Sequence, residues 1–353
     1  MKIVSIVGAR PQFIKCAPLS RLIREKHEEI LIHTGQHYDT GMSDIFFDEL
    51  KIPKPNYNLG VGSNSHGVQT GKMLIEIEKI LLRESPDLVL VYGDTNSTLA
   101  GDLAASKLHI KTAHIEAGLR SFDRSMPEEI NRVLTDHTSD LLFCPTETAV
   151  LNLKKEGITT GVYNVGDVML DSLKYNIRIA EQKATILGKL NLNSKEYIVA
   201  TVHRASNTDS FENLSSITNA FCHTGVSIVF TVHPRTEKYL KQYGLWNKLC
   251  EKVKVIPPLG YLEMLKLMVH AKKILTDSGG VQKEAYMLGV PCITMRENTE
   301  WVETIEDGGN VLVGTDYEKI MDAILNFKGV PVKGNFFGNG NACAEICKTL
   351  NKL

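Results

Sequence analysis

The chain has 353 residues, 43% of them hydrophobic and 23% charged, with a formal net charge of −1. This balance argues against a nucleic-acid-binding or membrane-surface protein, because such proteins usually carry a basic excess. The length exceeds the size at which a single hydrophobic core stops growing, so we expect two domains.

Membrane spans, secretion signals and metal sites also have recognisable sequence patterns. No apolar run approaches the roughly 20 residues of a membrane span, and the amino-terminal run has the wrong flanks for a signal peptide, so we expect a cytoplasmic protein. The seven cysteines contain no Cys-x-x-Cys pair, so the sequence predicts no metal site.

The first half of the chain predicts a series of strand–turn–helix units. Residues 2–7 form a β-branched run that ends at Gly8, and a helical pattern opens directly afterwards. This turn has one glycine where a dinucleotide fingerprint has three, so no nicotinamide site is predicted. Arg10 and Lys15 flank the helix N-terminus, which favours an anion, although two solvated cations explain this stretch equally well.

Asp94 follows another predicted strand, residues 88–92, and precedes a helix predicted over 99–107. At the carboxyl end of a strand it could contact a ligand. As the N-cap of the helix it would be structural, and for a lone Asp after a Gly this is the simpler interpretation.

The stretch from His114 to Arg132 is the densest charged segment and follows the predicted strand 112–115. It holds one histidine, four acidic residues and three arginines. Parallel α/β proteins bind ligands at the carboxyl ends of their strands, so we expect the reaction centre here. Two-residue alternation would place His114 and Glu116 on the same face of the strand.

Glu128 has both a structural and a functional interpretation. Ser125 and Glu128 have the spacing of a capping box for a helix that begins at Pro127, and Arg132, four residues on, could neutralise Glu128. In the functional interpretation, Glu128 is one of several carboxylates in one desolvated site, where mutual repulsion should raise the pKa of at least one.

From about residue 194 the strand–helix alternation restarts, which predicts a second doubly wound domain. We expect an α/β fold of two Rossmann-like domains that face each other across a cleft. The first would span residues 1–167, with a C-terminal helix of about 336–353 packing back on it, and the second residues 168–335. Four strands of the second half end in polar turns, at 197–202, 227–232, 253–256 and 273–276.

The turn from Asp277 to Gly280 is the most informative element of the second half. Its glycines let the backbone approach a ligand, and the helix behind it supplies free N–H groups, so the turn resembles a diphosphate cradle. Glu284 lies six residues after Ser278, about 9 Å further along the helix, which suits ribose hydroxyls. Without the turn, an exposed helical glutamate would be an equally good interpretation.

Six motifs together resemble the non-hydrolysing UDP-N-acetylglucosamine 2-epimerases, from residue 3 to about residue 313. In chain order they are GARPQFIK, TGQHYD, YGDTNSTLAG, HIEAGLRSFDRSMPEEINR, TVHRASNTD and TDSGGVQKEA. The resemblance implies a glycosyltransferase-B type fold and inversion of C2 of the sugar by elimination of UDP to a 2-acetamidoglucal and its re-addition. It also implies a homodimer and neither a metal nor another cofactor.

By position in these motifs, the resemblance implies catalytic residues and UDP contacts. The implied catalytic residues are Asp94, Glu116, Glu128 and His203. The implied UDP or substrate contacts are Arg10, Lys15, His203, Arg235, Ser278, Gly279, Gly280 and Glu284. Rival interpretations are a hydrolysing epimerase, a glycosyltransferase of the same fold, and a UDP-sugar-binding protein without turnover.

Two departures from the family pattern bear on the substrate and on regulation. Trp301 stands where many members have an arginine. Together with VYGDTNSTLAG and the segment 67–70, this resembles the branch that acts on UDP-2,3-diacetamido-2,3-dideoxy-glucuronate. Similar blocks also occur in archaeal-type UDP-N-acetylglucosamine epimerases, so the first expected reaction is conversion of UDP-N-acetylglucosamine to UDP-N-acetylmannosamine. Val68–Gln69 replaces the Arg–Gln pair of substrate-activated bacterial members, and Asp39 replaces a glutamine. We therefore expect the allosteric site of those enzymes to be absent or altered.

Overall fold

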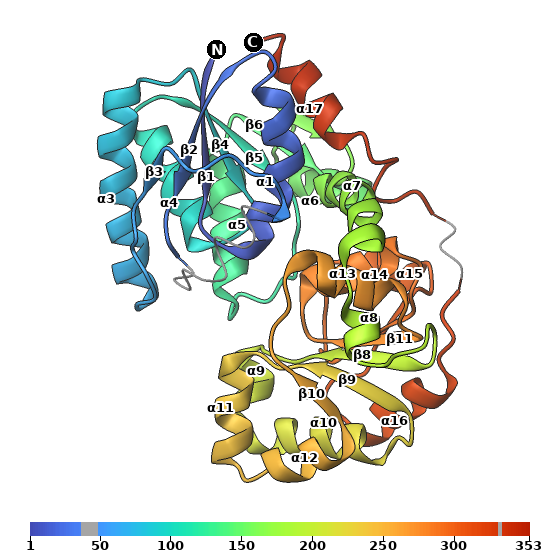
Figure 1. Cartoon of the computed structure of the whole chain (residues 1–353). Helices are drawn as coiled ribbons and strands as arrows, with labels where there is room; N and C mark the ends of the chain where they lie inside the picture. Colours follow the sequence, from blue (N-terminus) through green and yellow to red (C-terminus); the bar gives the residue numbers. More distant parts are fainter. Residues whose placement is uncertain (37–48, 331–333) are drawn as a thin grey trace. The chain divides into compact units, whose positions relative to one another are not determined.

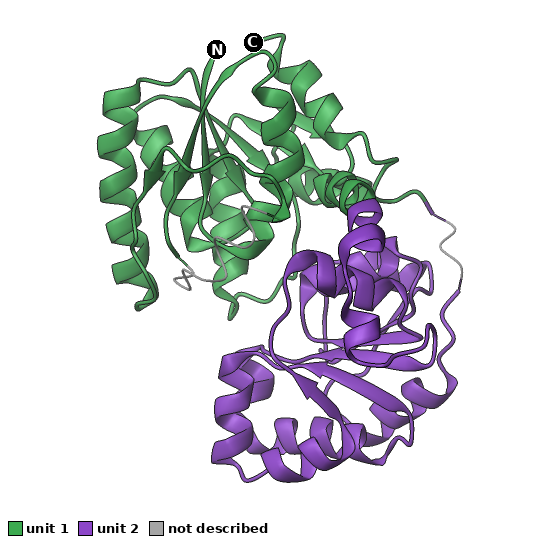
Figure 2. Ribbon diagram, viewed as in Figure 1, with its two compact units in different colours: residues 1–176, 335–353 green, residues 177–334 purple. Residues whose placement is uncertain are grey.

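The computed structural model describes residues 1–36, 49–330 and 334–353 and divides into two compact units (Figure 2). Unit 1 joins Met1–Asn176 to Asn335–Leu353, and unit 2 comprises Ile177–Gly334. The division falls inside helix α7 (Val168–Lys183), whereas the sequence placed it before this helix. Within the described ranges, no helix has the length and apolar character that a membrane crossing requires.

Unit 1 is built on a parallel sheet of seven strands in the order β3-β2-β1-β4-β5-β6-β7 (Figure 1). The strands are β1 (Lys2–Val7), β2 (Glu28–His33), β3 (Tyr57–Asn58), β4 (Leu88–Tyr92), β5 (Lys111–Ile115), β6 (Leu141–Cys144) and β7 (Val162–Asn164). The helices among the described residues of unit 1 are α1 (Arg10–Ile23), α3 (His66–Glu84), α4 (Asn96–Lys107), α5 (Pro127–Thr138), α6 (Glu147–Lys155), the first part of α7, and α17 (Ala342–Leu350).

Both faces of this sheet are covered, as the continuous apolar strands predict. Val4 and Ile6 of β1 pack with the apolar sides of α3 and α4, whereas α17 packs against α1 (Figure 1). The main chain of α17 is anchored to unit 1 because the backbone N–H groups of Ala342 and Cys343 donate to Asp171 at 3.1 and 3.0 Å.

Unit 2 repeats the architecture with six parallel strands in the order β10-β9-β8-β11-β12-β13 (Figure 1). The strands are β8 (Tyr197–Thr201), β9 (Ser227–Thr231), β10 (Lys254–Ile256), β11 (Lys273–Thr276), β12 (Cys292–Thr294) and β13 (Asn310–Leu312). The helices, after the end of α7, are α8 (Ile186–Lys189), α9 (Ala205–Thr208), α10 (Phe211–His223), α11 (Pro234–Gln242), α12 (Trp246–Lys252), α13 (Tyr261–Val269), α14 (Gly279–Met287), α15 (Val302–Glu306) and α16 (Tyr317–Asn326).

The core of unit 2 has two layers because alternate residues of one strand face opposite sides. Ile198 and Ala200 of β8 pack with α10 and α16. Tyr197 and Val199 of the same strand pack with α13 and with Ala285 of α14. The expected doubly wound α/β fold is therefore confirmed for each unit.

Candidate functional site

Several candidate residues follow the strands at which each sheet reverses its strand order. In unit 1, β1 lies beside β4, and in unit 2, β8 lies beside β11. On one side of each of these strand pairs the sheet is built from the earlier strands of the unit, and on the other side from the later strands. Such a switch point leaves space for ligands beyond the carboxyl ends of the strands. Asp94 follows β4 and His203 follows β8, so each unit contributes candidate groups at its own switch point.

Asp94 is not the helix N-cap, so the structural interpretation from the sequence is wrong. Thr95 is the N-cap of α4, and its side chain accepts from the backbone N–H of Thr98 at 3.4 Å. The carboxylate of Asp94 instead accepts from Nη2 of Arg132 at 2.5 Å and keeps 29% of its side-chain surface exposed. Asp94 is thus held at the strand end by a cation while it stays accessible.

Glu116 occupies the turn after β5 rather than the strand itself, so the expected shared face with His114 is wrong. Its φ angle is +76°, in the left-handed region that side chains rarely adopt. The backbone N–H of Glu116 donates to Phe143 at 3.1 Å, and this bond holds the unusual conformation in place. Backbone strain of this kind concentrates at functional sites.

Lys15 and Glu116 form a buried ion pair through Nζ and Oε2, with 7% and 8% of these residues exposed. A Cβ added to Gly93 would lie 3.0 Å from Lys15 Nζ and 3.4 Å from Glu116 Oε2. The Gly93–Asp94 turn therefore lies against this pair. A glycine there leaves room for both charged groups.

The capping box predicted for Ser125 and Glu128 is wrong, because α5 has Met126 as its N-cap, without a side-chain cap bond. Glu129, the next residue, secures the start of the helix instead, because it accepts from the backbone N–H groups of Ser121 and Phe122, both at 2.9 Å. Glu128 is left exposed in the first turn. Its structural explanation is thereby removed.

Arg132 links two acids, but it does so with Glu129 and Asp94 and not by the predicted pairing with Glu128. Its guanidinium contacts Glu129 at 3.0 Å and Asp94 at 2.5 Å. The close charged partners of Asp94 and Glu116 are therefore cations. The sequence predicted carboxylates that repel one another in this site, and the structure pairs each of these two with a cation.

Gln12 is an organising residue that sequence reasoning missed. Its buried Oε1 accepts from the backbone N–H groups of Gly8 and Ala9 at 2.8 and 3.0 Å. Its Nε2 donates to the carbonyl of Tyr92 at 2.9 Å, so one amide ties the turn after β1 to the end of β4. The only signal in the sequence was a glutamine two residues after the first residue of α1.

Gly118 offers a test of how tightly the loop after Glu116 is packed. Its φ is +80°, and an added Cβ would lie 2.4 Å from the carbonyl oxygen of Ala149. Gly157 has a φ of +83° and nothing within 4 Å, which makes it the matched control. We expect Gly157→Ala to lower the free energy of unfolding by about 1 kcal/mol from backbone strain, and Gly118→Ala to lower it by a further ~1–3 kcal/mol from the clash.

Urea unfolding of both variants, followed by circular dichroism, measures this difference. Equal losses at the two glycines would show that the loop relaxes freely around the added methyl group.

In unit 2, Asp277 organises the turn after β8, a role that the sequence did not reveal. Its fully buried carboxylate accepts from the backbone N–H groups of His203 and Arg204 at 3.0 and 2.9 Å. Asn207 Nδ2 donates to the same carboxylate at 3.1 Å. Asp277 thus joins the turn after β8 to the turn after β11. The imidazole of His203 remains partly exposed, with its ring centroid 5.9 Å from that of His233.

The Ser278 turn has the features expected of an anion site. Ser278 is the N-cap of α14, but its hydroxyl makes no cap bond, so the first N–H groups of the helix are not satisfied by it. Gly279 lies close to Glu300: an added Cβ would be 2.1 Å from Oε1 of Glu300, so that side chain would have to move. Gly280 is exposed, and Glu284 is buried further along the helix.

Two cations assigned to UDP by resemblance have different settings. Arg10, partly exposed, is the first residue of α1. Arg235 is bound by both carboxylate oxygens of Asp209, each at 2.6 Å, and its Nε donates to Thr208 at 3.0 Å. A ligand phosphate would have to share this guanidinium with Asp209.

The positions at which the chain departs from the family pattern differ in their burial. Trp301 is 3% exposed, and Lys283 Nζ lies 4.1 Å from its ring centroid. Val68 is exposed, whereas Gln69 is buried and donates to the carbonyl of Gly62 at 2.7 Å. Asp39 lies outside the described residues.

Comparisons with known proteins agree with this architecture. A family model described as UDP-N-acetylglucosamine 2-epimerase matches residues 21–351. A UDP-N-acetylglucosamine 2-epimerase homolog of Methanococcus maripaludis is 63% identical over 100% of both chains. The UDP-2,3-diacetamido-2,3-dideoxy-D-glucuronate 2-epimerase of Pseudomonas aeruginosa is 50% identical, again over 100% of both.

A solved structure confirms the expected fold class of the glycosyltransferase-B type. It is the crystal structure of Methanocaldococcus jannaschii UDP-GlcNAc 2-epimerase in complex with UDP-GlcNAc and UDP, with a TM-score of 0.95 and 49% identity over 100% of both chains. Because the family match, the full-length relatives and the doubly wound units agree, the chain belongs to the UDP-N-acetylglucosamine 2-epimerase family of isomerases.

Proposed function

We propose that the protein is a non-hydrolysing epimerase that converts UDP-N-acetylglucosamine to UDP-N-acetylmannosamine. A base removes the C2 proton, the bond from C1 to the diphosphate oxygen breaks, and UDP leaves a 2-acetamidoglucal. UDP then adds back to C1 while an acid delivers a proton to the opposite face of C2. The observation that carries this proposal is that Asp94 and Glu116, two acids at adjacent strand ends, are each held by a cation in a chain of this family.

We assign proton transfer at C2 to the acids of unit 1, Asp94, Glu116 and Glu128. A carboxylate can take up a proton or, once protonated, donate one. The pairing of Asp94 with Arg132 and of Glu116 with Lys15 supports this assignment, because a neighbouring cation fixes the position of each carboxylate.

We assign the departing diphosphate to unit 2. His203 and the Ser278–Gly279–Gly280 turn would donate to its oxygens and stabilise the negative charge that develops as UDP leaves. Glu284 would accept from the ribose hydroxyls, with Arg10 and Arg235 as further UDP contacts.

A second substrate, UDP-2,3-diacetamido-2,3-dideoxy-glucuronate, is favoured by one specific observation. The relative of that name from Pseudomonas aeruginosa is 50% identical along the whole chain. The same acids and the same elimination would serve both sugars, since the two share the 2-acetamido group and the UDP leaving group.

Incubation with each UDP-sugar in deuterated water, followed by proton NMR, tests the reaction and the substrate together. We expect deuterium to enter at C2 while UDP stays attached, and the better substrate to exchange faster. Free N-acetylmannosamine would indicate a hydrolysing epimerase, and turnover only with an acceptor would indicate a transferase. Binding of UDP without any exchange would leave only a UDP-sugar-binding protein.

The product would supply surface polysaccharide or glycan synthesis, and we propose that the protein works in the cytoplasm as a homodimer. Family membership supports this assignment. Sedimentation equilibrium at micromolar concentration is expected to give twice the 39.2 kDa mass of the chain, and a single-chain mass would contradict it.

A further inference from the structure

His114 is fully buried in β5, and both of its ring nitrogens contact hydrogen-bond acceptors. Nδ1 lies 2.7 Å from Oδ1 of Asp136, and Nε2 lies 2.7 Å from the carbonyl oxygen of Gly93. A carbonyl oxygen can only accept, so Nε2 must carry a hydrogen. Whether Nδ1 also carries one depends on the charge of Asp136.

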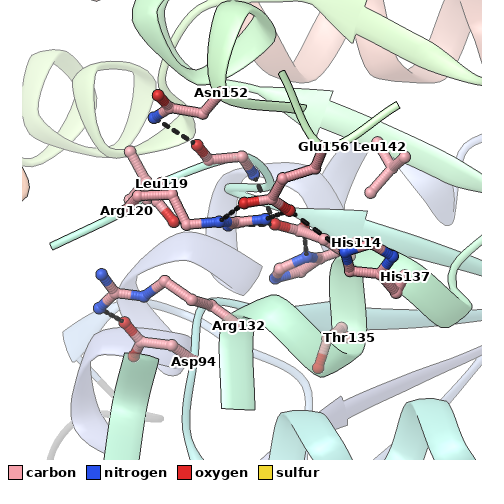
Figure 3. A network of polar contacts seen from close by, with 12 residues as sticks. Asp94, His114, Leu119, Arg120, Arg132, Thr135, His137, Leu142, Asn152 and Glu156 are labelled. Carbon is pink, nitrogen blue, oxygen red and sulfur yellow. Dashed lines mark hydrogen bonds and ion pairs between the residues drawn. The ribbon is translucent and has the colours of Figure 1, made fainter. Parts of the chain in front are cut away.

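Asp136, on α5, is surrounded by donors. Its Oδ2 accepts from Arg120 Nη1 at 2.6 Å and from the backbone N–H of Gly118 at 3.0 Å. These contacts hold Asp136 as a carboxylate, so Nδ1 of His114 must donate as well and the ring is an imidazolium. Arg120 is bound in turn by both oxygens of Glu156, each at 2.7 Å (Figure 3).

The electrostatics of this network agree with its geometry. Burial alone would lower the pKa of His114, but the hydrogen bond and charge of Asp136, the Gly93 carbonyl and the charge of Asp102 on α4 together raise it above its ordinary value. Burial would likewise raise the pKa of Asp136. The hydrogen bonds and charges of His114 and Arg120 outweigh this effect of burial, so the pKa of Asp136 is lowered. Cations and carboxylates thus alternate along the network: His114 contacts Asp136, Asp136 contacts Arg120, and Arg120 contacts Glu156.

The network fixes the main chain just before Asp94 and just after Glu116. The Gly93 carbonyl, which His114 binds, belongs to the residue before Asp94. The Gly118 N–H, which Asp136 binds, lies two residues after Glu116, and the carbonyl of Gly118 accepts from Asn152 at 3.1 Å. A shift of about 1 Å in a catalytic group can lower a rate by ~100-fold, so these anchors bear directly on turnover.

We propose that His114 is a positioning residue of the epimerase reaction: as a buried imidazolium joined to Asp136 and Arg120, it holds the two turns that carry Asp94 and Glu116 in register. It does not touch substrate. This role rests on the proposed function, because it is a role in C2 proton transfer.

The protonation state is tested on the unmodified enzyme by NMR with ¹⁵N-labelled histidine, and a His114→Gln sample identifies the signal among the 11 histidines. We expect both ring nitrogens of His114 to carry protons at pH values above its ordinary pKa of about 6.5. A ring with one unprotonated nitrogen there would overturn the proposal.

The positioning role is tested by kinetics of His114→Gln against a matched control. Glu29→Gln removes another buried charge of unit 1, one that accepts from Ser5 at 2.6 Å and from Arg24 at 2.7 Å near the start of β2. We expect both variants to lose stability. Only His114→Gln should lower kcat, by about 100-fold. The dissociation constant for UDP, whose diphosphate is assigned to unit 2, should change less than about two-fold.

The pH dependence of stability gives a further readout. Because folding raises the pKa of His114, its contribution to stability is fully present below the unfolded pKa and is lost as the pH rises through the folded pKa. The difference in free energy of unfolding between wild type and His114→Gln should therefore shrink in alkali, and a constant difference would contradict an imidazolium.

If His114→Gln does not fold, Asp136→Asn provides the second variant, and the same loss of kcat is expected. If His114→Gln or Asp136→Asn has the same kcat as the Glu29→Gln control, the positioning role is overturned. A wild-type enzyme without C2 exchange would instead overturn the proposed function and the role together, whereas a neutral ring in an active enzyme would overturn only the role of His114.

Discussion

Replacing Glu116 by glutamine is expected to lower kcat for C2 epimerisation by about 10²–10⁴-fold, the range typical for loss of a general acid or base. Glutamine keeps the shape of the side chain but can neither take up nor deliver a proton. Lys15 keeps an amide oxygen as a hydrogen-bond acceptor but loses its charged partner. The free energy of unfolding should fall by about 1–3 kcal/mol, because a buried ammonium is left less well compensated.

Initial rates of UDP-N-acetylmannosamine formation, with calorimetric titration of UDP, separate catalysis from binding. The affinity for UDP should stay within about two-fold of wild type if the diphosphate contacts lie in unit 2. Glu29→Gln again serves as the control for loss of a buried carboxylate, and it should turn over normally. A Glu116→Gln enzyme with wild-type kcat would remove Glu116 from the chemistry.

The Asp94→Asn variant is expected to show a loss of kcat of similar size with a much smaller effect on stability. Its side chain is 29% exposed and shares Arg132 with Glu129, so the free energy of unfolding should change by less than about 1 kcal/mol. Asp140→Asn is the control: this aspartate accepts from the backbone N–H of Thr112 at 2.8 Å, near the other end of β5, and should not affect turnover. An Asp94→Asn enzyme as active as Asp140→Asn would contradict a catalytic role.

Deuterium incorporation in the two variants together can assign the faces of the sugar. If Asp94 and Glu116 serve opposite faces of C2, each variant can still remove and return the proton of one epimer without inverting it. One variant should then exchange deuterium only into UDP-N-acetylglucosamine and the other only into UDP-N-acetylmannosamine. Exchange of both epimers in one variant would show that its missing acid is dispensable.

Local signals predicted the elements well because they depend on neighbours in the chain. Buried β-branched runs and the helical patterns behind them identified β1, β4 and β5 and the turn that follows β4 at Gly93. Where two local interpretations competed, the simpler one failed. Thr95 caps α4 in place of Asp94, and Glu129 secures the start of α5 in place of Glu128.

The sequence by itself determined two doubly wound units, the family, and the set of polar residues at the strand ends, because hydrophobic periodicity, glycine turns and motif spacing are encoded locally. The tertiary structure alone decided the partners: Lys15 for Glu116, Arg132 for Asp94, and Asp136 with the Gly93 carbonyl for His114. These contacts join residues 21 to 101 positions apart in the chain. Side chains so distant in sequence meet only when parallel strands align their carboxyl ends, so no local pattern could specify which charge neutralises which.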